Sequence, residues 1–108
     1  MNDQPLYITV LVDQQILVEC RKNDPWDWIK LNNTLVNSDS LVQIYVNYSL
    51  YQINIDRKEF YELYSFFGTT LYSLVHENSN VIIFCDIMEQ NANLYLKSIK
   101  VINLGFFE

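Results

Sequence analysis

The fold class of this chain depends on one stretch, residues 56–76, whose sequence is DRKEFYELYSFFGTTLYSLVH. Asp56 can cap the N-terminus of a helix, and Glu59 stands three residues later, as in a capping box. Glu62 adds a carboxylate that the positive end of a helix dipole favours. Apolar residues then recur at helical spacing: Phe60, Leu63, Tyr64, Phe67, Leu71, Leu74 and Val75. The stretch predicts one main helix over residues 57–76.

Gly68 leaves a second interpretation of this stretch open. Glycine is tolerated inside a helix at a cost of about 1 kcal/mol relative to alanine, but it is also common just after a helix end. Thr69 and Thr70 follow it, and β-branched residues favour strands. In this alternative the helix ends at Phe67 and residues 69–75 form a strand. The continuous apolar stripe favours the single helix.

The N-terminal part of the chain predicts a β-hairpin from residues 6–12 and 16–20, both rich in β-branched residues. If Val12 faces Ile16, Val10 faces Val18 and Ile8 faces Cys20, then six apolar side chains share one face. This register requires a connection of odd length or a β-bulge, because a shift by one residue would place Glu19 on that face.

Further strands follow from alternation. Residues 41–47 and 50–55 alternate apolar and polar side chains, which indicates strands with one buried and one wet face, joined by a tight turn or bend at 47–49. Residues 81–88 are apolar on both faces, as expected of a central strand, and residues 94–103 form a final strand.

The remaining segments predict a loop and a short helix. The run at 32–40 is rich in Asn, Ser and Asp and predicts a loop. Asp24 and Pro25 suit the cap and first residue of a short helix near 25–30. The fold class is therefore α+β, in one globular domain over residues 1–108. It has an antiparallel sheet of about five or six strands built from hairpins, with the main helix packed on it.

Composition bears on partners and compartment. The 13 acidic and 7 basic side chains give a net charge of −6, which argues against nucleic-acid binding. The charge either favours encounter with a basic protein or mainly keeps the chain in solution, and composition does not separate the two. No run approaches the roughly 20 apolar residues of a membrane span. The start of the chain lacks the basic region of a signal peptide. Cys20 and Cys85 could form one disulfide, but free thiols are the simpler interpretation, and the expected compartment is the cytoplasm.

Residues able to perform catalysis are scarce. His76 is the only histidine, and with Cys85 and Asp86 it could be arranged as a thiol nucleophile site. However, Cys85 alternates with Ile83 and Ile87, which is typical of a core thiol. One histidine and two distant cysteines do not make a zinc site, and two glycines do not make a phosphate-binding loop. The sequence predicts no catalytic residue, no metal and no cofactor.

Asp86 has two interpretations. It interrupts an apolar strand on the face shared with Ile82, Phe84 and Met88. If that face is covered, the carboxylate must be hydrogen-bonded or paired, since an unpaired buried charge is very unfavourable. If the face is open, Asp86 stands within an exposed apolar patch, which suits a partner-binding surface. Structural support within a central strand is the favoured interpretation.

The strongest interaction candidate is the segment Asp24, Pro25, Trp26, Asp27 and Trp28. Consecutive helical positions point in different directions, so the two rings and two carboxylates cannot all be buried. Tryptophan is frequent in binding hot spots, and the carboxylates suit a basic partner. The alternative is that both rings close one end of the core.

Glu59 and Glu62, at the start of the main helix, complete the predicted partner-binding set of Asp24, Trp26, Asp27, Trp28, Glu59 and Glu62. In general make-up the chain is similar to small acidic bacterial inhibitors: immunity proteins that neutralise nuclease toxins, and phage-encoded inhibitors of nucleic-acid enzymes. The likeness lies in composition and covers no particular motif. It implies a non-enzymatic inhibitor of a basic bacterial toxin. The alternatives are an accessory subunit that assembles through a sheet edge, and a small thiol-dependent hydrolase using Cys85.

Overall fold

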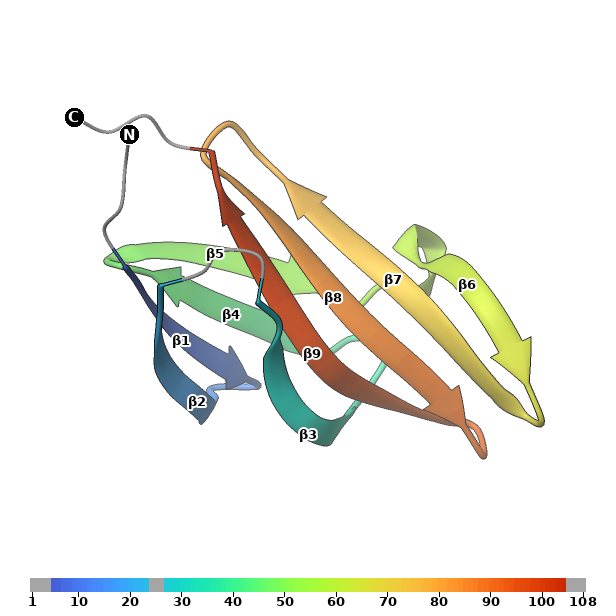
Figure 1. Ribbon diagram of the computed structural model, residues 1–108. Helices are drawn as coiled ribbons and strands as arrows, with labels where there is room; N and C mark the ends of the chain where they lie inside the picture. Colours follow the sequence, from blue (N-terminus) through green and yellow to red (C-terminus); the bar gives the residue numbers. More distant parts are fainter. Residues whose placement is uncertain (1–4, 24–26, 105–108) are drawn as a thin grey trace.

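The computed structural model describes residues 5–23 and 27–104, and these residues form nine β-strands and one turn of 3-10 helix (Figure 1). All strand pairs are antiparallel. The elements are β1 (Leu6–Val12), β2 (Gln15–Lys22), β3 (Ile29–Val36), β4 (Leu41–Val46), β5 (Ser49–Asn54), η1 (Arg57–Glu59), β6 (Tyr61–Phe66), β7 (Thr69–Glu77), β8 (Val81–Gln90) and β9 (Asn93–Asn103).

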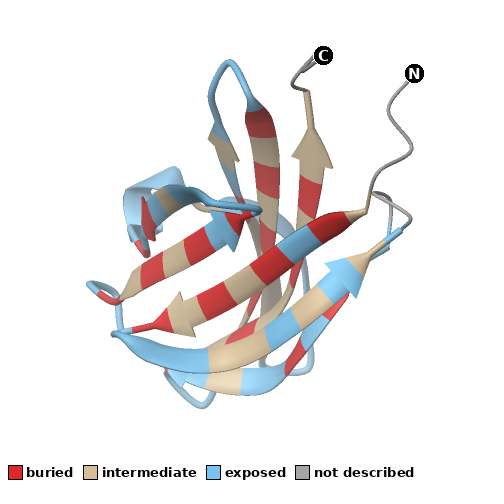
Figure 2. Ribbon diagram, turned by 90° about the vertical axis from the view of Figure 1, so that its left-hand side faces the viewer, coloured by how far each residue is buried: buried red, intermediate tan, exposed pale blue. Residues whose placement is uncertain are grey.

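The strands form two sheets. The four-stranded sheet has the order β2-β1-β4-β5, and the five-stranded sheet has the order β3-β9-β8-β7-β6. Figure 2 shows buried positions alternating with more exposed ones along the strands, as expected when each sheet turns one face to the core. The fully buried side chains come from both sheets and are Ile8, Val10, Val42, Ile44, Ile55, Val81, Ile83, Cys85, Ile87, Leu96 and Ile99.

The predicted main helix over residues 57–76 is wrong, and with it the α+β class. Helix η1 is a single turn, capped as predicted by Asp56, whose side chain accepts a hydrogen bond of 3.0 Å from the Lys58 backbone N–H. Strands β6 and β7 follow. Phe67 and Gly68 form the two-residue turn between them, both with positive φ, which is the geometry of a type I′ hairpin. The φ of +79° is what favours glycine at position 68. Space is not the reason, because a Cβ there would meet nothing within 4 Å.

A β-bulge explains why this stretch resembles a helix. The register of β6 against β7 shifts between Glu62 and Tyr64, so one extra residue lies in β6. Tyr61 and Tyr64 therefore lie on the same face of the sheet although they are three residues apart. A spacing of three is what an amphipathic helix shows, and in β6 the bulge produces it within a strand.

The predictions for the segment after Lys22 are confirmed for the loop at residues 37–40 and wrong for the described residues before it. Residues 24–26 of the predicted short helix near 25–30 lie outside the described part, while Asp27 lies in a bend and β3 begins at Ile29. The predicted loop at 32–40 contains the second half of β3. Asn32 and Asn33, with φ of 56° and 54°, form an irregularity in that strand, because asparagine tolerates the left-handed region well.

The other predicted strands are confirmed. In the first hairpin Val10 pairs with Val18 and Ile8 with Cys20, and a bulge after Val10 supplies the predicted shift. The turn itself is shorter than the one proposed, so that Val12 faces Gln15 instead of Ile16. Strand β8 is the middle strand of its sheet, as its apolar sequence predicted.

The two sheets differ in length. Strands β7, β8 and β9 are the longest in the molecule, and their lower ends in Figure 1, with the β6–β7 and β8–β9 turns, extend beyond the four-stranded sheet. Within residues 5–23 and 27–104, no helix has the length and apolar character needed to cross a bilayer.

Candidate protein-binding face

The most unusual surface of the molecule is the outer face of the five-stranded sheet, which we define as the side turned away from the four-stranded sheet. Strand β8 shows it directly, because its buried residues alternate with partly exposed ones: Ile82, Phe84, Asp86 and Met88. These four side chains therefore point outward. The strand register carries the same face across β9 and β3 on one side and across β7 and β6 on the other.

The register arranges the outer face in rows that run across the strands. The first row consists of Trp28, Lys100, Phe84 and Val75. The Lys100 Nζ lies 4.7 Å from the centre of the Trp28 ring and 5.4 Å from the centre of the Phe84 ring, so the ammonium joins the two rings. Trp28 is 36% exposed. This row presents an aromatic surface held in place by a cation.

A second apolar row crosses the sheet from edge to edge and consists of Leu35, Tyr95, Met88, Leu71 and Tyr64. Leu35 and Tyr64, at its two ends, are 60% and 57% exposed. The three side chains between them are partly buried. An apolar row that spans five strands and stays partly exposed among the described residues is uncommon on a protein surface.

A polar row lies between the two apolar rows and consists of Lys30, Ser98, Asp86, Ser73 and Tyr61. The Ser98 hydroxyl donates a hydrogen bond of 3.3 Å to Asp86 Oδ2. Partial burial raises the pKa of the Asp86 carboxyl above its ordinary value, while the Ser98 hydrogen bond and the charges of Lys97 and Lys100 act in the opposite direction. Of the two interpretations of Asp86, the structure therefore supports the one in which its face of the sheet is open and the carboxylate stands within a partly exposed apolar patch.

An open hollow of about 460 Å³ lies at the projecting end of this face, between the β6–β7 turn and β8–β9. Phe67, at the turn, is 91% exposed, and Lys97 supplies the cationic group. The full lining is Tyr64, Phe66, Phe67, Thr69, Leu71, Met88, Gln90 and Lys97. Aromatic and aliphatic side chains and a few polar groups share the lining, a mixture that is usual in recognition pockets.

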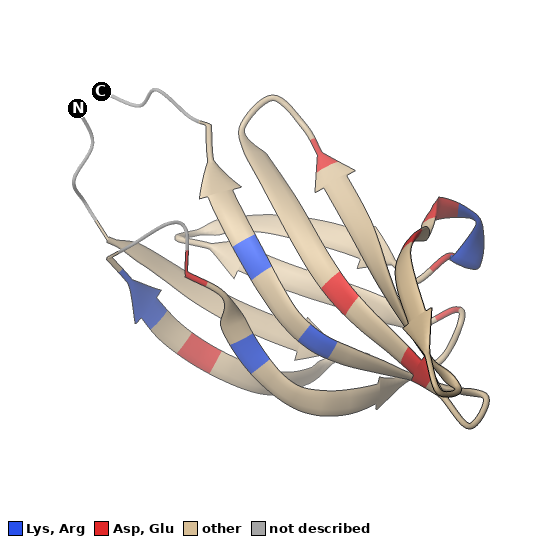
Figure 3. Ribbon diagram, turned by 45° about the vertical axis from the view of Figure 1, so that its right-hand side comes forward, with Lys and Arg blue, Asp and Glu red and all other residues tan. Residues whose placement is uncertain are grey.

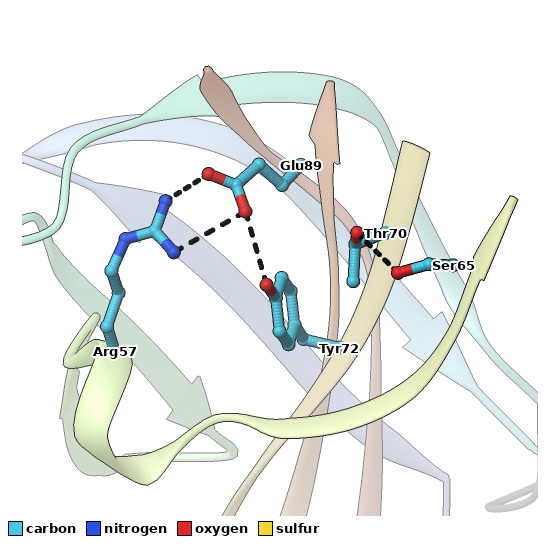
Figure 4. Close-up of polar contacts among 5 residues, drawn as sticks. All are labelled: Arg57, Ser65, Thr70, Tyr72 and Glu89. Carbon is cyan, nitrogen blue, oxygen red and sulfur yellow. Dashed lines mark hydrogen bonds and ion pairs between the residues drawn. The ribbon is translucent and has the colours of Figure 1, made fainter. Parts of the chain in front are cut away.

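The inner side of the same projecting end is polar, because no strand of the other sheet covers it. Arg57, from η1, forms an ion pair with Glu89 of β8, and the Tyr72 hydroxyl donates a hydrogen bond of 3.2 Å to Glu89 Oε1 (Figure 4). Beside them, the hydroxyls of Ser65 and Thr70 lie 2.7 Å apart. These contacts tie η1 and β6 to the long strands. Phe60 and Tyr72, whose ring centres are 5.1 Å apart, also pack against the hydrophobic core, so polar and apolar contacts together hold this end.

The charge of the outer face differs from that of the whole chain. Figure 3 shows basic positions on β3 and β9, and an acidic position on β8 on the other side of β9 from β3. The register places Lys30 and Lys100 on this face with the carboxylates of Asp86 and Glu77, and Lys97 lines the hollow at its projecting end. The chain as a whole carries a net charge of −6. This grouping could not be predicted from the sequence, since Lys30 is distant from the other two lysines in the chain.

The predicted partner-binding residues are distributed over separate parts of the structure. Asp24 and Trp26 lie outside the described residues, while Asp27 is exposed just before β3 and Trp28 joins the first row. Glu59 lies in η1 and Glu62 in β6, both exposed and close in sequence. Strands β3 and β6 are opposite edges of the sheet, about 19 Å apart at about 4.8 Å per strand spacing. Glu59 and Glu62 therefore lie at the β6 edge, far from Asp27 and Trp28 at the β3 edge.

The proposed thiol site is not assembled. Cys85 is fully buried in the core, and this burial raises the pKa of its thiol to about 12, whereas a nucleophilic thiol needs a lowered pKa. Asp86 points to the outer face, away from Cys85. In the described ranges, no group of three or more His, Cys, Asp or Glu side chains could hold a metal ion. The geometry gives the hydrolase alternative no support.

No family profile matches the sequence, and neither a characterised protein nor a solved structure is significantly similar to it.

Proposed function

We propose that this chain is a non-enzymatic protein-binding protein and that it binds its partner through the outer face of the five-stranded sheet. The observation that carries the proposal is the pair of apolar rows on either side of a polar row, one with Trp28 and Phe84 and one with Leu71 and Tyr64, which are partly or largely exposed. Soluble proteins rarely keep such a contiguous surface unless another molecule covers it.

The composition of the face supports a protein as the partner. Aromatic residues and methionine are enriched in protein interfaces, and tryptophan and tyrosine dominate their hot spots. The polar row between the apolar rows would fix orientation, because an incorrectly placed partner would leave Asp86 or Lys30 buried without a counterpart. The rigid sheet behind the face reduces the entropy lost on binding, since the strands are already ordered.

The finer proposal is an inhibitor of a basic bacterial toxin, of the immunity-protein kind. The net charge of −6 supports it, because a long-range field attracts a basic partner before contact. At contact distance, Lys30 and Lys97 would require carboxylates on the partner. A basic partner that carries carboxylates at its contact surface meets both conditions. The attraction before contact depends on the net charge of each protein, whereas the contacts depend on local groups, whose fields are screened beyond about 8–10 Å.

Calorimetry with the toxin encoded beside the gene tests this proposal. Phe84→Ala, on the outer face, should weaken binding by roughly 2 kcal/mol, about thirtyfold, as for a hot-spot ring. Tyr45→Ala is the matched control, because Tyr45 is an aromatic residue of β4 in the other sheet with 38% exposure. The association rate should also fall with added salt. Equal effects of the two substitutions, or no binding, would contradict the proposal.

A second candidate function is an accessory subunit that assembles through a sheet edge. Strand β6 is the observation that favours it, since it is an edge strand and all of its residues are exposed. Leu63→Lys in β6 should then reduce assembly with the partner subunit while Phe84→Ala leaves it unchanged. The two proposed functions therefore respond to different substitutions in the same sheet.

A further inference from the structure

Strand β6 has the properties of an unsatisfied pairing edge. It is the last strand of the five-stranded sheet, and among residues 5–23 and 27–104 it pairs only with β7, so one side of its backbone has no strand partner there. Such edges are templates for another strand, and proteins usually protect them with lysine, proline or a covering element. The sequence of β6, YELYSF, contains no lysine and no proline, and Glu62 is its only charged residue. Its aromatic rings are more than half exposed.

We propose that the occupant of this edge is β6 of a second copy of the chain, paired antiparallel about a two-fold axis between Leu63 and Tyr64. Tyr61 then lies opposite Phe66 of the second copy, Glu62 opposite Ser65, and Leu63 opposite Tyr64. Each contact occurs twice, as in any two-fold interface. Ten strands would form one continuous sheet.

The bulge in β6 selects this register. Residues directly opposite in a sheet must point to the same face. Pairing with β7 places Tyr61, Tyr64 and Phe66 on the outer face, opposite Ser73, Leu71 and Thr69. It places Glu62 and Ser65 on the inner face, opposite Tyr72 and Thr70. An axis between positions 63 and 64 matches outer with outer for Tyr61 and Phe66 and inner with inner for Glu62 and Ser65, and it sets the bulged Leu63 opposite Tyr64.

Neighbouring registers fail on face or on charge. An axis through Leu63 or Tyr64 sets the inward Glu62 against an outward ring, Tyr64 in the first case and Phe66 in the second. An axis through Glu62 sets two carboxylates directly opposite each other, which is destabilising. An axis between Glu62 and Leu63 leaves the last two residues of β6, Ser65 and Phe66, unpaired. The proposed register uses all six residues of β6 and brings no like charges together.

The area available is that of a weak but specific dimer. The side chains of Tyr61, Tyr64, Phe66 and Phe67 are each more than half exposed. At roughly 200 Å² for a full aromatic side chain, the two copies together expose on the order of 1,000 Å² of ring surface, which is an upper limit for the area that pairing covers and lies near the lower limit for a specific interface. Backbone hydrogen bonds between the two edges add to this. The second apolar row, which ends at Tyr64, would continue into the same row of the other copy.

This inference deepens the second candidate function, because it names the occupant of the edge, and it is independent of the first candidate. Sedimentation velocity on the purified full chain tests it without any other partner. We expect a monomer–dimer equilibrium whose dimer fraction rises with protein concentration. A wild-type chain that stays monomeric at all concentrations overturns the inference, whereas the inhibitor proposal fails only in the calorimetry experiment with the toxin.

Leu63→Lys should raise the dissociation constant of the dimer by roughly tenfold or more, because a lysine on an edge strand opposes pairing. Tyr48→Lys is the control: Tyr48 is 99% exposed in the β4–β5 turn, and its substitution should leave the dimer unchanged. Circular dichroism of both variants establishes that they fold, which is expected because each replaced side chain is exposed. If the dimer weakens equally in both variants, the contact does not lie at β6.

Substitutions at Ser65 test the register itself. Ser65→Lys would face Glu62 of the second copy twice per dimer and should strengthen the dimer, whereas Ser65→Glu should weaken it. Each change should be roughly fivefold, from two cross-strand charge pairs. Opposite signs for the two variants support the axis between Leu63 and Tyr64. Identical effects, or none, overturn it.

Discussion

Ser98 donates a hydrogen bond to Asp86 from the neighbouring strand, and this pair stands at the centre of the outer face, between Phe84 on one side and Met88 on the other. The pair marks the place where a carboxylate is held within an apolar surface. Partial burial of the charged Asp86 carboxylate is unfavourable for the stability of the free chain, because it raises the pKa of this carboxyl, and the Ser98 hydrogen bond offsets only part of this effect. A group retained at some loss of stability is consistent with a role in contact.

The pH dependence of stability should report this carboxyl. The folded-state pKa of Asp86 lies above its ordinary value of 3.8, so the folded chain keeps the proton where the unfolded chain has released it. Its contribution to stability therefore falls as pH rises above 3.8 and stays reduced at neutral pH. Asp86→Asn should be more stable than wild type at neutral pH by on the order of 0.5 kcal/mol, since solvent reduces the effect of a partly exposed group.

Urea unfolding of both chains at neutral pH and near pH 3 measures this difference. The advantage of Asp86→Asn should shrink in acid, where the wild-type carboxyl is also neutral. Ser98→Ala should lower stability at neutral pH, because it removes the hydrogen bond that offsets the buried charge. An Asp86→Asn chain that is less stable at neutral pH than in acid, relative to wild type, would contradict the assignment.

Glu89 should show the opposite pH dependence. The Arg57 guanidinium, followed by the Tyr72 hydroxyl, holds the pKa of the Glu89 carboxyl below its ordinary value of 4.5. The stability it contributes is fully present above pH 4.5 and is lost as pH falls through the lowered pKa. Glu89→Gln should therefore cost about 1 kcal/mol at neutral pH, as expected for a partly exposed ion pair with an added hydrogen bond.

Thermal or urea unfolding against pH checks this, with Glu77→Gln as the control because Glu77 is an exposed carboxylate on β7 of the same sheet. The Glu77→Gln chain should follow the wild-type curve. A loss of stability in Glu89→Gln that persists unchanged in strong acid would exclude the ion pair as its cause.

The two thiols should differ in reactivity. Cys85 is fully buried and the pKa of its thiol is raised to about 12, so its thiolate is scarce at pH 8. Burial also raises the pKa of the Cys20 thiol, but Cys20 is partly exposed on β2. Iodoacetamide should label Cys20 in the folded chain and Cys85 only in denaturant, as followed by peptide mass mapping. Labelling of Cys85 at the Cys20 rate under native conditions would require a more open core.

Asp13 should contribute strongly to the first turn. Its Oδ1 accepts a hydrogen bond of 3.0 Å from the Leu41 N–H, and its Oδ2 accepts one of 3.0 Å from the hydroxyl of Ser40, a residue buried at 2% exposure. Asp13→Ala should lower stability by about 1–3 kcal/mol, because buried polar partners lose their acceptor. Asp13→Asn keeps one acceptor and tolerates the φ of 49°, so it should lose less. Gln14→Ala in the same turn is the control, and urea unfolding midpoints rank the three chains.

Local alternation was sufficient to predict most strands. Residues 41–47 and 50–55 alternate strictly and form β4 and β5, and the register of the first hairpin followed from keeping Glu19 off the apolar face. The prediction failed where a strand does not alternate. The bulge at Leu63 places rings three residues apart on one face, and the asparagines of β3 interrupt its pairing with β9.

The outer face could not be predicted from the sequence, for a different reason. Its rows depend on register between distant segments: Leu35 becomes a neighbour of Tyr95, and Trp28 of Lys100, only after β3 pairs with β9. The available signal was the exposed side of β8 together with the abundance of Tyr and Phe around residues 60–72. The helix prediction assigned those rings to a core stripe.

The pairing of β3 with β9 also has a consequence during synthesis on the ribosome. Strands β1, β2, β4 and β5 can complete their sheet as soon as they emerge, because their partners are close in sequence. Strand β3 emerges among them, but its partner is the last strand to be translated. Until then its aliphatic side chains, including Ile29 and Leu31, have no sheet to join. Nascent chains of this protein should therefore depend on chaperones over that interval. A chain truncated before β9 should remain bound to the chaperone.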